Sequence, residues 1–144
     1  MKPSEFFSLL RPHVPSTGVP AAFILAQGAL ESAWGESKLS VLGMNLFGVK
    51  ADKSWNGEVL ELPTREFLNG KWVTVNAKWR KYSTWAECLN DHAHFLKSNP
   101  RYSKAFATKT ACAFAEAVAN AGYATDPKYP EKICSIIKKY GLEG

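Results

Sequence analysis

The hydrophobic pattern of the chain has helical spacing near both ends and strand-like alternation in the middle. Residues 20–34 are apolar on nearly all sides of a helix and therefore predict a buried helix, with Gly35 closing it. Thr84 and Thr110 stand where a helix needs a capping hydroxyl. Glycines at two positions predict an irregular segment over residues 40–50. The remaining helices are predicted at residues 5–10, 84–97, 110–122 and 126–140.

A hairpin is predicted between the helical halves. Residues 58–62 and 72–79 are rich in Val, Leu, Thr and Trp, and the Asn69-Gly70 pair between them is a strong signal for a two-residue turn. Pairing outward from that turn places Glu66 opposite Val73, on the face that carries the apolar side chains. Pro63 indicates an edge strand or a bulge.

Helices, one hairpin and further helices make an α+β arrangement that is mainly α. A chain of 144 residues suits one hydrophobic core, so residues 1–144 are expected to form a single domain, and a monomer. Within this domain the hairpin is expected to form a small β-lobe of about residues 57–80.

The charge of the chain limits its partners only broadly. The net charge is +5, and the excess lies in residues 73–144, which hold eleven basic and six acidic side chains. Such a surface attracts polyanions, among them nucleic acid, anionic lipid and the acidic bacterial wall. The longest apolar run is too short and too interrupted to span a bilayer, so stable membrane insertion is not expected.

Metal and disulfide chemistry are not indicated by the sequence. Cys88, Cys112 and Cys134 are odd in number, form no C-x-x-C pair and fall in predicted helices, so reduced thiols are expected. On a helix, His92 and His94 would point about 200° apart and would not converge on an ion. We therefore expect no bound metal and no cofactor.

Glu31 is the one ionisable side chain within residues 20–34, and Gln27 lies one helical turn before it on the same face. Desolvation raises the pKa of a lone carboxyl group in such surroundings. A carboxylic acid that keeps its proton near neutral pH suits general acid catalysis, such as protonation of a glycosidic oxygen. The alternative is a core glutamate satisfied by a backbone amide or a lysine. The position of Glu31 near the helix end favours a carboxyl group that opens on a cleft.

Glu66 is the candidate for a second carboxyl group. Strand alternation puts it on the inward face near the hairpin tip, from where it can reach across a groove toward a helix. Its role there would be that of a base or a charge stabiliser. A plain solvated glutamate stays open as the alternative, and Glu58 and Glu61 are rival carboxylates.

Five short motifs, in order along the chain, resemble glycoside hydrolase family 73. They are ALESAWG at 29–35, NLFGVK at 45–50, TRE at 64–66 followed by WRKY at 79–82, NPRY at 99–102 and YATDP at 123–127. The family includes the glucosaminidase domain of flagellar rod hydrolases, bacterial autolysins and phage lysins. A single motif would be weak, but five in the same order over about residues 16–140 are specific.

The resemblance implies a lysozyme-like helical domain with a small β-lobe, and endo-β-N-acetylglucosaminidase activity on peptidoglycan. It carries the catalytic acid onto Glu31, the second carboxylate onto Glu66 and an active-site tyrosine onto Tyr123. The role of the second carboxylate is less settled across the family. Five residues at or beside the motifs are expected to contact the substrate: Gln27, Trp34, Asn45, Phe47 and Tyr102. Ala33 departs from the family, which usually has glycine there.

The expected function is hydrolysis of the β-1,4 bond between N-acetylglucosamine and N-acetylmuramic acid in the glycan strands of peptidoglycan. The compact chain shows no secretory signal and no appended wall-binding domain, which favours a phage endolysin. Such a protein would stay in the host cytoplasm until release and then act in the periplasm or cell wall. A flagellar or secretion-associated enzyme exported by another route is the alternative.

Three other functions stay open at this point. A lytic transglycosylase would use the same fold and a single glutamate but leave a 1,6-anhydro sugar. A non-catalytic module would bind peptidoglycan and release nothing. A nucleic-acid binder is suggested only by the basic second half of the chain, and nucleic acid is not the partner we expect.

Overall fold

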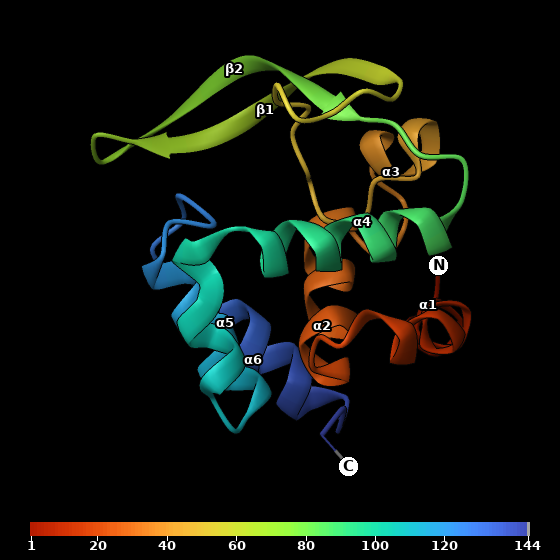
Figure 1. The fold of residues 1–144 in the computed structure, drawn as a ribbon, viewed down its shortest axis with the longest axis vertical. Coiled ribbons are helices and arrows are strands. Elements are labelled where there is room, and N and C mark those ends of the chain that lie inside the picture. Colours follow the sequence, from red (N-terminus) through yellow and green to blue (C-terminus); the bar gives the residue numbers. More distant parts are fainter. Residues whose placement is uncertain (144) are drawn as a thin grey trace.

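The computed structural model describes residues 1–143, and its secondary structure is mainly helical (Figure 1). The α-helices are α1 (Pro3–Leu10), α2 (Ala21–Ser32), α3 (Lys38–Gly43), α4 (Trp85–Ser98), α5 (Ala111–Asn120) and α6 (Tyr129–Lys139). Short 3-10 helices are η1 (Arg11–His13), η2 (Pro15–Thr17) and η3 (Pro100–Ala107). The two strands are β1 (Val59–Leu68) and β2 (Lys71–Arg80). This confirms the expected α+β arrangement dominated by helices.

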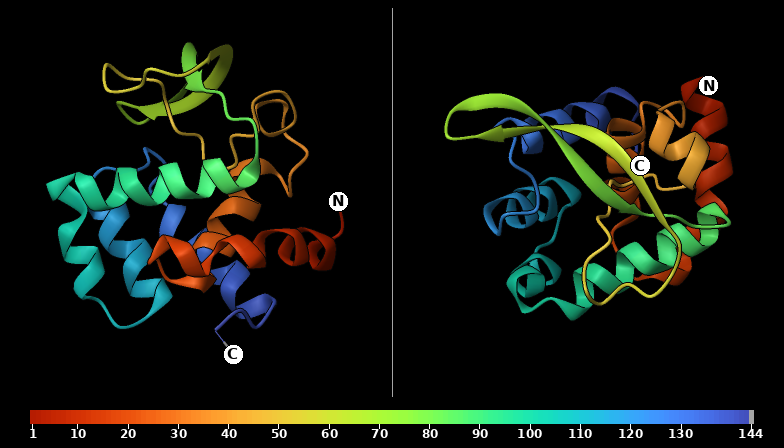
Figure 2. Two further views of the ribbon diagram at one scale, coloured as in Figure 1. Left: turned by 45° about the vertical axis from the view of Figure 1, so that its right-hand side comes forward. Right: turned by 90° about the horizontal axis from the view of Figure 1, so that it is seen from above.

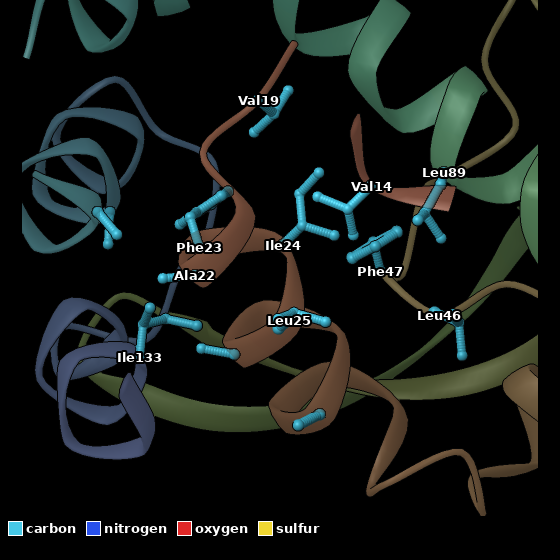
Figure 3. Packing of buried hydrophobic residues seen from close by; sticks show 14 of the residues in the cluster. Val14, Val19, Ala22, Phe23, Ile24, Leu25, Leu46, Phe47, Leu89 and Ile133 are labelled. Carbon is cyan, nitrogen blue, oxygen red and sulfur yellow. The ribbon is translucent and has the colours of Figure 1, made fainter. Parts of the chain in front are cut away.

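Helix α2 lies at the centre of the helical body. It packs against α1, α5 and α6, and residues 22–29 are buried. Figure 3 shows its apolar side chains pointing to several sides of the helix, as the sequence pattern requires. The helix ends at Ser32, two residues before the predicted end, because Ala33 and Trp34 already have left-handed φ angles of 50° and 59°. The Ser32 hydroxyl accepts a 2.8 Å hydrogen bond from the Gly35 amide and stabilises this turn.

The hairpin has the predicted register, with Leu68 opposite Lys71 and Glu66 opposite Val73. Asn69 and Gly70 have φ angles of 52° and 77°, which a two-residue type I′ turn requires. Pro63 pairs with Asn76 without a bulge, in a two-stranded sheet where both strands are edges. The hairpin crosses over one side of the helical body (Figures 1 and 2).

Some helix boundaries differ from the sequence prediction. The segment predicted to be irregular overlaps α3, whose first turn is capped by Ser37 accepting from the Ser40 amide at 3.1 Å. Helix α6 begins at Tyr129 rather than near residue 126. The predicted caps Thr84 and Thr110 are confirmed, since each hydroxyl accepts a backbone N–H three residues ahead. A helix of only six residues is too short for its apolar spacing to be recognised in the sequence.

The helices in residues 1–143 can be compared with what a membrane-spanning helix requires. None of them combines the length and apolarity that crossing a bilayer requires.

The three cysteines lie in α4, α5 and α6, and all three are free thiols.

Candidate active site

A cleft of about 550 Å³ lies between the hairpin and the helical body. Its wall is built from the end of α2, the loop after α3, the hairpin near its tip, and the loop that joins α5 to α6. The polar and charged side chains in this wall are Glu31, Lys50, Asp52, Thr64, Arg65, Glu66, Tyr102, Tyr123, Thr125, Asp126, Tyr129 and Lys132. Aromatic rings of Phe47, Trp72, Trp79 and Phe95 complete it.

Glu31 lies in the last turn of α2, at the point where that helix reaches the cleft. Its side chain is exposed on the cleft side, whereas protein surrounds it on the other sides. Desolvation by this surrounding protein raises the pKa of the carboxyl group to about 7, although the neighbouring Tyr129 hydroxyl acts in the opposite direction. The negative charge of Glu66 raises it further. A fraction of Glu31 therefore carries its proton at neutral pH.

Gly48 brings the backbone of the loop after α3 close to this carboxyl group. Its φ angle is 66°, a conformation that side chains rarely adopt, and a Cβ atom there would lie 3.7 Å from Glu31 Oε2 and 3.7 Å from Trp79. Glycine thus permits the backbone conformation and leaves room beside the carboxyl group.

Glu66 faces the same cleft from strand β1 and is held by two partners. Lys50 Nζ lies 2.8 Å from Glu66 Oε1, and the Thr125 hydroxyl donates to Oε2 at 3.1 Å. The backbone amide of Phe67 donates to the same Thr125 hydroxyl at 3.0 Å. The hairpin tip is therefore joined across the cleft to the loop between α5 and α6. Glu58 and Glu61, the rival carboxylates, are exposed and lie outside the cleft wall.

Tyr123, Phe47 and Tyr102 form one aromatic part of the wall. The Tyr123 hydroxyl donates to the Phe47 carbonyl oxygen at 3.4 Å, and the rings of Tyr102 and Tyr123 are 6.0 Å apart edge to face. Phe47 and Tyr102 are almost wholly buried, at 1% and 3% exposure, so they offer a ligand little surface.

Three of the predicted substrate contacts do not line the cleft. Gln27 is fully buried and bonded to His92 and Tyr129. Trp34 packs edge to face against aromatic rings of α1. Asn45 is buried because its side chain bonds the backbone of Val49 and Arg80. Because none of the three is in the cleft wall, their positions do not indicate the direct substrate contact that the sequence predicts.

Several residues that line the cleft were not predicted as site residues from the sequence. They are Lys50, Trp72, Thr125, Asp126, Tyr129 and Lys132. Lys50, Thr125 and Asp126 lie inside the quoted motifs, which is the signal that was available. Trp72 is 45% exposed next to the hairpin tip, where its ring is available to stack on a sugar. In residues 1–143 no group of three or more His, Cys, Asp or Glu side chains is arranged to hold a metal ion.

Comparison with known proteins identifies the family. The model of the glucosaminidase family, described as mannosyl-glycoprotein endo-beta-N-acetylglucosaminidase, matches residues 12–142. The chain belongs to the glucosaminidase family. This confirms the membership that the five motifs indicated.

Relatives of this glucosaminidase-family chain include a peptidoglycan hydrolase and an exo-glucosaminidase. It is 46% identical over 127 residues to peptidoglycan hydrolase FlgJ of Salmonella typhimurium, a match that covers 85% of this chain and 40% of that protein. It is 40% identical over 124 residues to exo-glucosaminidase LytG of Bacillus subtilis, with 83% and 43% covered. The chain therefore spans about two fifths of the length of these relatives.

Solved structures of the family have the same fold. A mutant peptidoglycan hydrolase from Sphingomonas sp. A1 gives a TM-score of 0.88 at 34% identity, with 96% of this chain and 95% of that chain covered. A C-terminally truncated glycoside hydrolase domain of Salmonella typhimurium FlgJ gives 0.75 at 41% identity, with 97% and 98% covered. These likenesses confirm the expected lysozyme-like arrangement with its small β-lobe.

Proposed function

We propose that this glucosaminidase-family chain hydrolyses the β-1,4 bond between N-acetylglucosamine and N-acetylmuramic acid in peptidoglycan, with Glu31 as the general acid. One observation carries the proposal: the Glu31 carboxyl group opens on a cleft with its pKa raised to about 7 by desolvation. The names of its relatives, peptidoglycan hydrolase and exo-glucosaminidase, support this class of substrate.

In the proposed reaction, protonated Glu31 gives its proton to the leaving glycosidic oxygen. Positive charge then develops on the sugar ring and needs stabilisation. Glu66 supplies it from the opposite wall as charge stabiliser or as base, since Lys50 and Thr125 fix its carboxylate there. The 2-acetamido group of the sugar, positioned by Tyr123, is the second candidate for this role. Phe47 and Tyr102 would contribute to substrate contact only through the edges that reach the cleft.

Replacing Glu31 by Gln tests the acid directly. We expect Glu31→Gln to fold normally and to lose about 100-fold to 10,000-fold in the rate of wall lysis, because general acid catalysis contributes that much. The matched control is Glu61→Gln, which changes an exposed glutamate on the outer face of the hairpin. Lysis by Glu31→Gln at the rate of the unchanged protein would remove Glu31 from the mechanism.

Analysis of the released fragments tests the bond and the reaction. Mass spectrometry after digestion should find N-acetylglucosamine at the new reducing ends. N-acetylmuramic acid there would indicate a muramidase, and a 1,6-anhydro end would indicate a lytic transglycosylase. Binding to walls with no release of fragments would indicate a non-catalytic module.

The pH dependence follows from the same carboxyl group. Because the acid must be protonated, kcat/KM should decline as pH rises through about 7, the pKa of Glu31. A profile that stays flat from pH 6 to pH 8 would contradict this assignment.

The proposal leaves origin and assembly to experiment. Phage endolysin origin, a host-cytoplasmic stage before release, and a monomeric state stay predictions, and the relatives named above are bacterial proteins. Expression inside a bacterium with and without a pore-forming holin tests the host-cytoplasmic stage, since lysis only with the pore is expected. Sedimentation equilibrium measures the oligomeric state.

A further inference from the structure

A chain of buried polar groups lies behind the Glu31 carboxyl group. It joins His92 of α4, Gln27 of α2 and Tyr129 of α6, which are at most 3% exposed. His92 Nε2 lies 2.7 Å from Gln27 Oε1, and Gln27 Nε2 lies 2.5 Å from the Tyr129 hydroxyl oxygen. Tyr129 and Glu31 line the same cleft, and the Tyr129 hydroxyl lowers the pKa of Glu31. Since these residues come from three helices, the chain exists only in the folded protein.

We infer that His92, Gln27 and Tyr129 form a one-way hydrogen-bond chain that aims the Tyr129 hydroxyl proton at the Glu31 carboxylate and so sets the pH range in which Glu31 acts. The three are positioning residues in this view. The inference rests on the proposed function for its catalytic meaning, whereas the hydrogen-bond chain itself can be measured without any turnover.

The direction of the chain starts at the unpaired nitrogen of His92. Its Nδ1 atom is buried and has no hydrogen-bond partner among residues 1–143. A proton on Nδ1 would be a buried unpaired N–H donor, which is rarer in proteins than an under-satisfied acceptor. The proton therefore belongs on Nε2, which donates to Gln27 Oε1. The ring is held in plane by stacking on Phe47 at 4.0 Å, and burial lowers the pKa of His92 to about 3, so it stays neutral.

The orientation of the Gln27 amide follows from that donor. With its oxygen engaged by His92, its NH₂ group must face the two tyrosines. It donates to the Tyr129 hydroxyl oxygen, and it also lowers the pKa of the nearby Tyr123 hydroxyl. Each hydroxyl then has its own proton left to give. Tyr123 gives it to the Phe47 carbonyl oxygen. In the inferred hydrogen-bond chain Tyr129 gives its proton to Glu31, which lines the same cleft and whose pKa the Tyr129 hydroxyl lowers.

A hydroxyl donor at this place stabilises the charged form of Glu31. It opposes the desolvation that raises the pKa, and it is the largest influence in that direction. The other charged groups that face Glu31 are Glu66 and Asp126, which raise its pKa, and Lys132, which lowers it. When Glu31 has given its proton to the leaving oxygen, the carboxylate left behind is the species that Tyr129 stabilises.

The test is to titrate Glu31 itself, by carbon-13 NMR of its side-chain carboxyl group, in variants along the chain. Tyr129→Phe removes the hydroxyl and keeps the ring, and it should raise the pKa of Glu31 by about one unit, since a hydrogen bond to a charged group is of that size. His92→Leu should shift it in the same direction, because Gln27 is then free to turn its oxygen toward Tyr129. His92→Gln supplies an N–H donor again and should restore the original titration.

A double variant and a control distinguish an effect transmitted through the hydrogen-bond chain from a general disturbance of the protein structure. Tyr129→Phe combined with His92→Leu should shift the titration no further than Tyr129→Phe alone, because His92 acts through Tyr129. Tyr82→Phe is the control, since the hydroxyl of this buried tyrosine donates to Asp91, outside the chain. The inference would be overturned if the pKa shifts of the two single variants added in the double variant. It would also be overturned if the titration of Glu31 were unchanged in His92→Leu. If His92→Leu does not fold, Gln27→Met is read by the same criteria.

Activity measurements separate this inference from the proposed function. The decline of kcat/KM with rising pH should move to higher pH in Tyr129→Phe by the same shift as the NMR titration. If the titration shifts but Glu31→Gln still lyses walls, the hydrogen-bond chain stands and the proposed catalytic role fails. If Glu31→Gln is inactive but the titration of Glu31 does not shift in the variants, the proposed catalytic role stands and the hydrogen-bond chain fails.

Discussion

At the scale of single residues, Glu31 shows how one side chain meets two environments. The cleft leaves its carboxyl group in contact with water, and the protein around it withholds enough solvent to raise its pKa to about 7. The raised pKa of Glu31 lowers the stability of the folded state by an amount that depends on pH. The unfolded chain ionises at the ordinary pKa of 4.5, so between pH 4.5 and about 7 the folded state binds a proton that the unfolded state has lost.

Glu31→Gln should therefore stabilise the fold at alkaline pH. Because the folded pKa is raised, the unfavourable contribution of Glu31 grows as pH rises from 4.5 to about 7 and is complete above that. The melting temperature of Glu31→Gln should exceed that of the unchanged protein at pH 8, with a smaller difference at pH 4. Scanning calorimetry at the two values measures it. A difference of the same size at both would show that ionisation of Glu31 is not involved.

His92 should influence stability in the opposite pH range. Its folded pKa is lowered to about 3 by burial, whereas the unfolded histidine binds a proton near pH 6.5. The unfolded state thus takes up more protons, and stability should fall as pH drops from 6.5 toward 3. Urea titrations of the unchanged protein and of His92→Gln should show a weaker acid loss in the variant. An equal loss in both would assign it to other groups.

At the scale of elements, the hairpin is fixed by its own sequence, and its contact with the helical body is not. The Asn69-Gly70 turn and the alternation of the strands specify the register through neighbouring residues. The contacts at its tip come from Lys50 and Thr125, which lie outside the hairpin. A two-stranded sheet is marginally stable by itself, so these contacts and those of α3 hold it over the cleft.

Thr125→Val should loosen the hairpin tip with little effect on the helices. The variant keeps the side-chain shape but removes the acceptor of the Phe67 amide and a donor to Glu66. One hydrogen bond contributes ~1 kcal/mol, so the Phe67 amide should exchange its hydrogen about fivefold faster. Hydrogen-exchange NMR measures this, and amides of α2 serve as the internal reference. Unchanged exchange at Phe67 would mean that the Thr125 contact does not restrain the tip.

At the scale of the whole molecule, the net charge of +5 affects how the protein approaches its substrate more than it affects the cleavage reaction. The excess of basic side chains in residues 73–144 attracts a polyanionic wall over a distance set by salt. That distance is about 10 Å at 0.1 M salt and about 3 Å at 1 M. Cleavage inside the cleft should depend on salt much less than arrival at the wall.

Salt should therefore slow the lysis of whole walls and leave the cleavage of small substrates nearly unchanged. Turbidity clearing of wall suspensions should fall several-fold between 0.05 M and 0.5 M sodium chloride, as is typical for electrostatic steering. Release of products from short, soluble glycan fragments, which contain the bond but carry few charges, is the matched measurement. Equal slowing of both would place the salt effect in the cleft.

The sequence by itself determined the features that depend on neighbouring residues. They are the all-round apolar helix that carries Glu31, the turn and register of the hairpin, and the capping of α4 and α5 by Thr84 and Thr110. The motifs also indicated the family, which the match over residues 12–142 confirms. In each case the information lies within a few positions of the residue concerned.

Only the tertiary structure decided which side chains surround the catalytic candidate. Tyr129 and Thr125 meet Glu31 and Glu66 from segments far away in the chain, and nothing in local spacing predicts such contacts. The same cause turned Gln27 inward: it shares a helix face with Glu31, yet His92 and Tyr129 satisfy its amide behind the cleft wall. A buried polar group needs partners, and the packing of helices determines where they are.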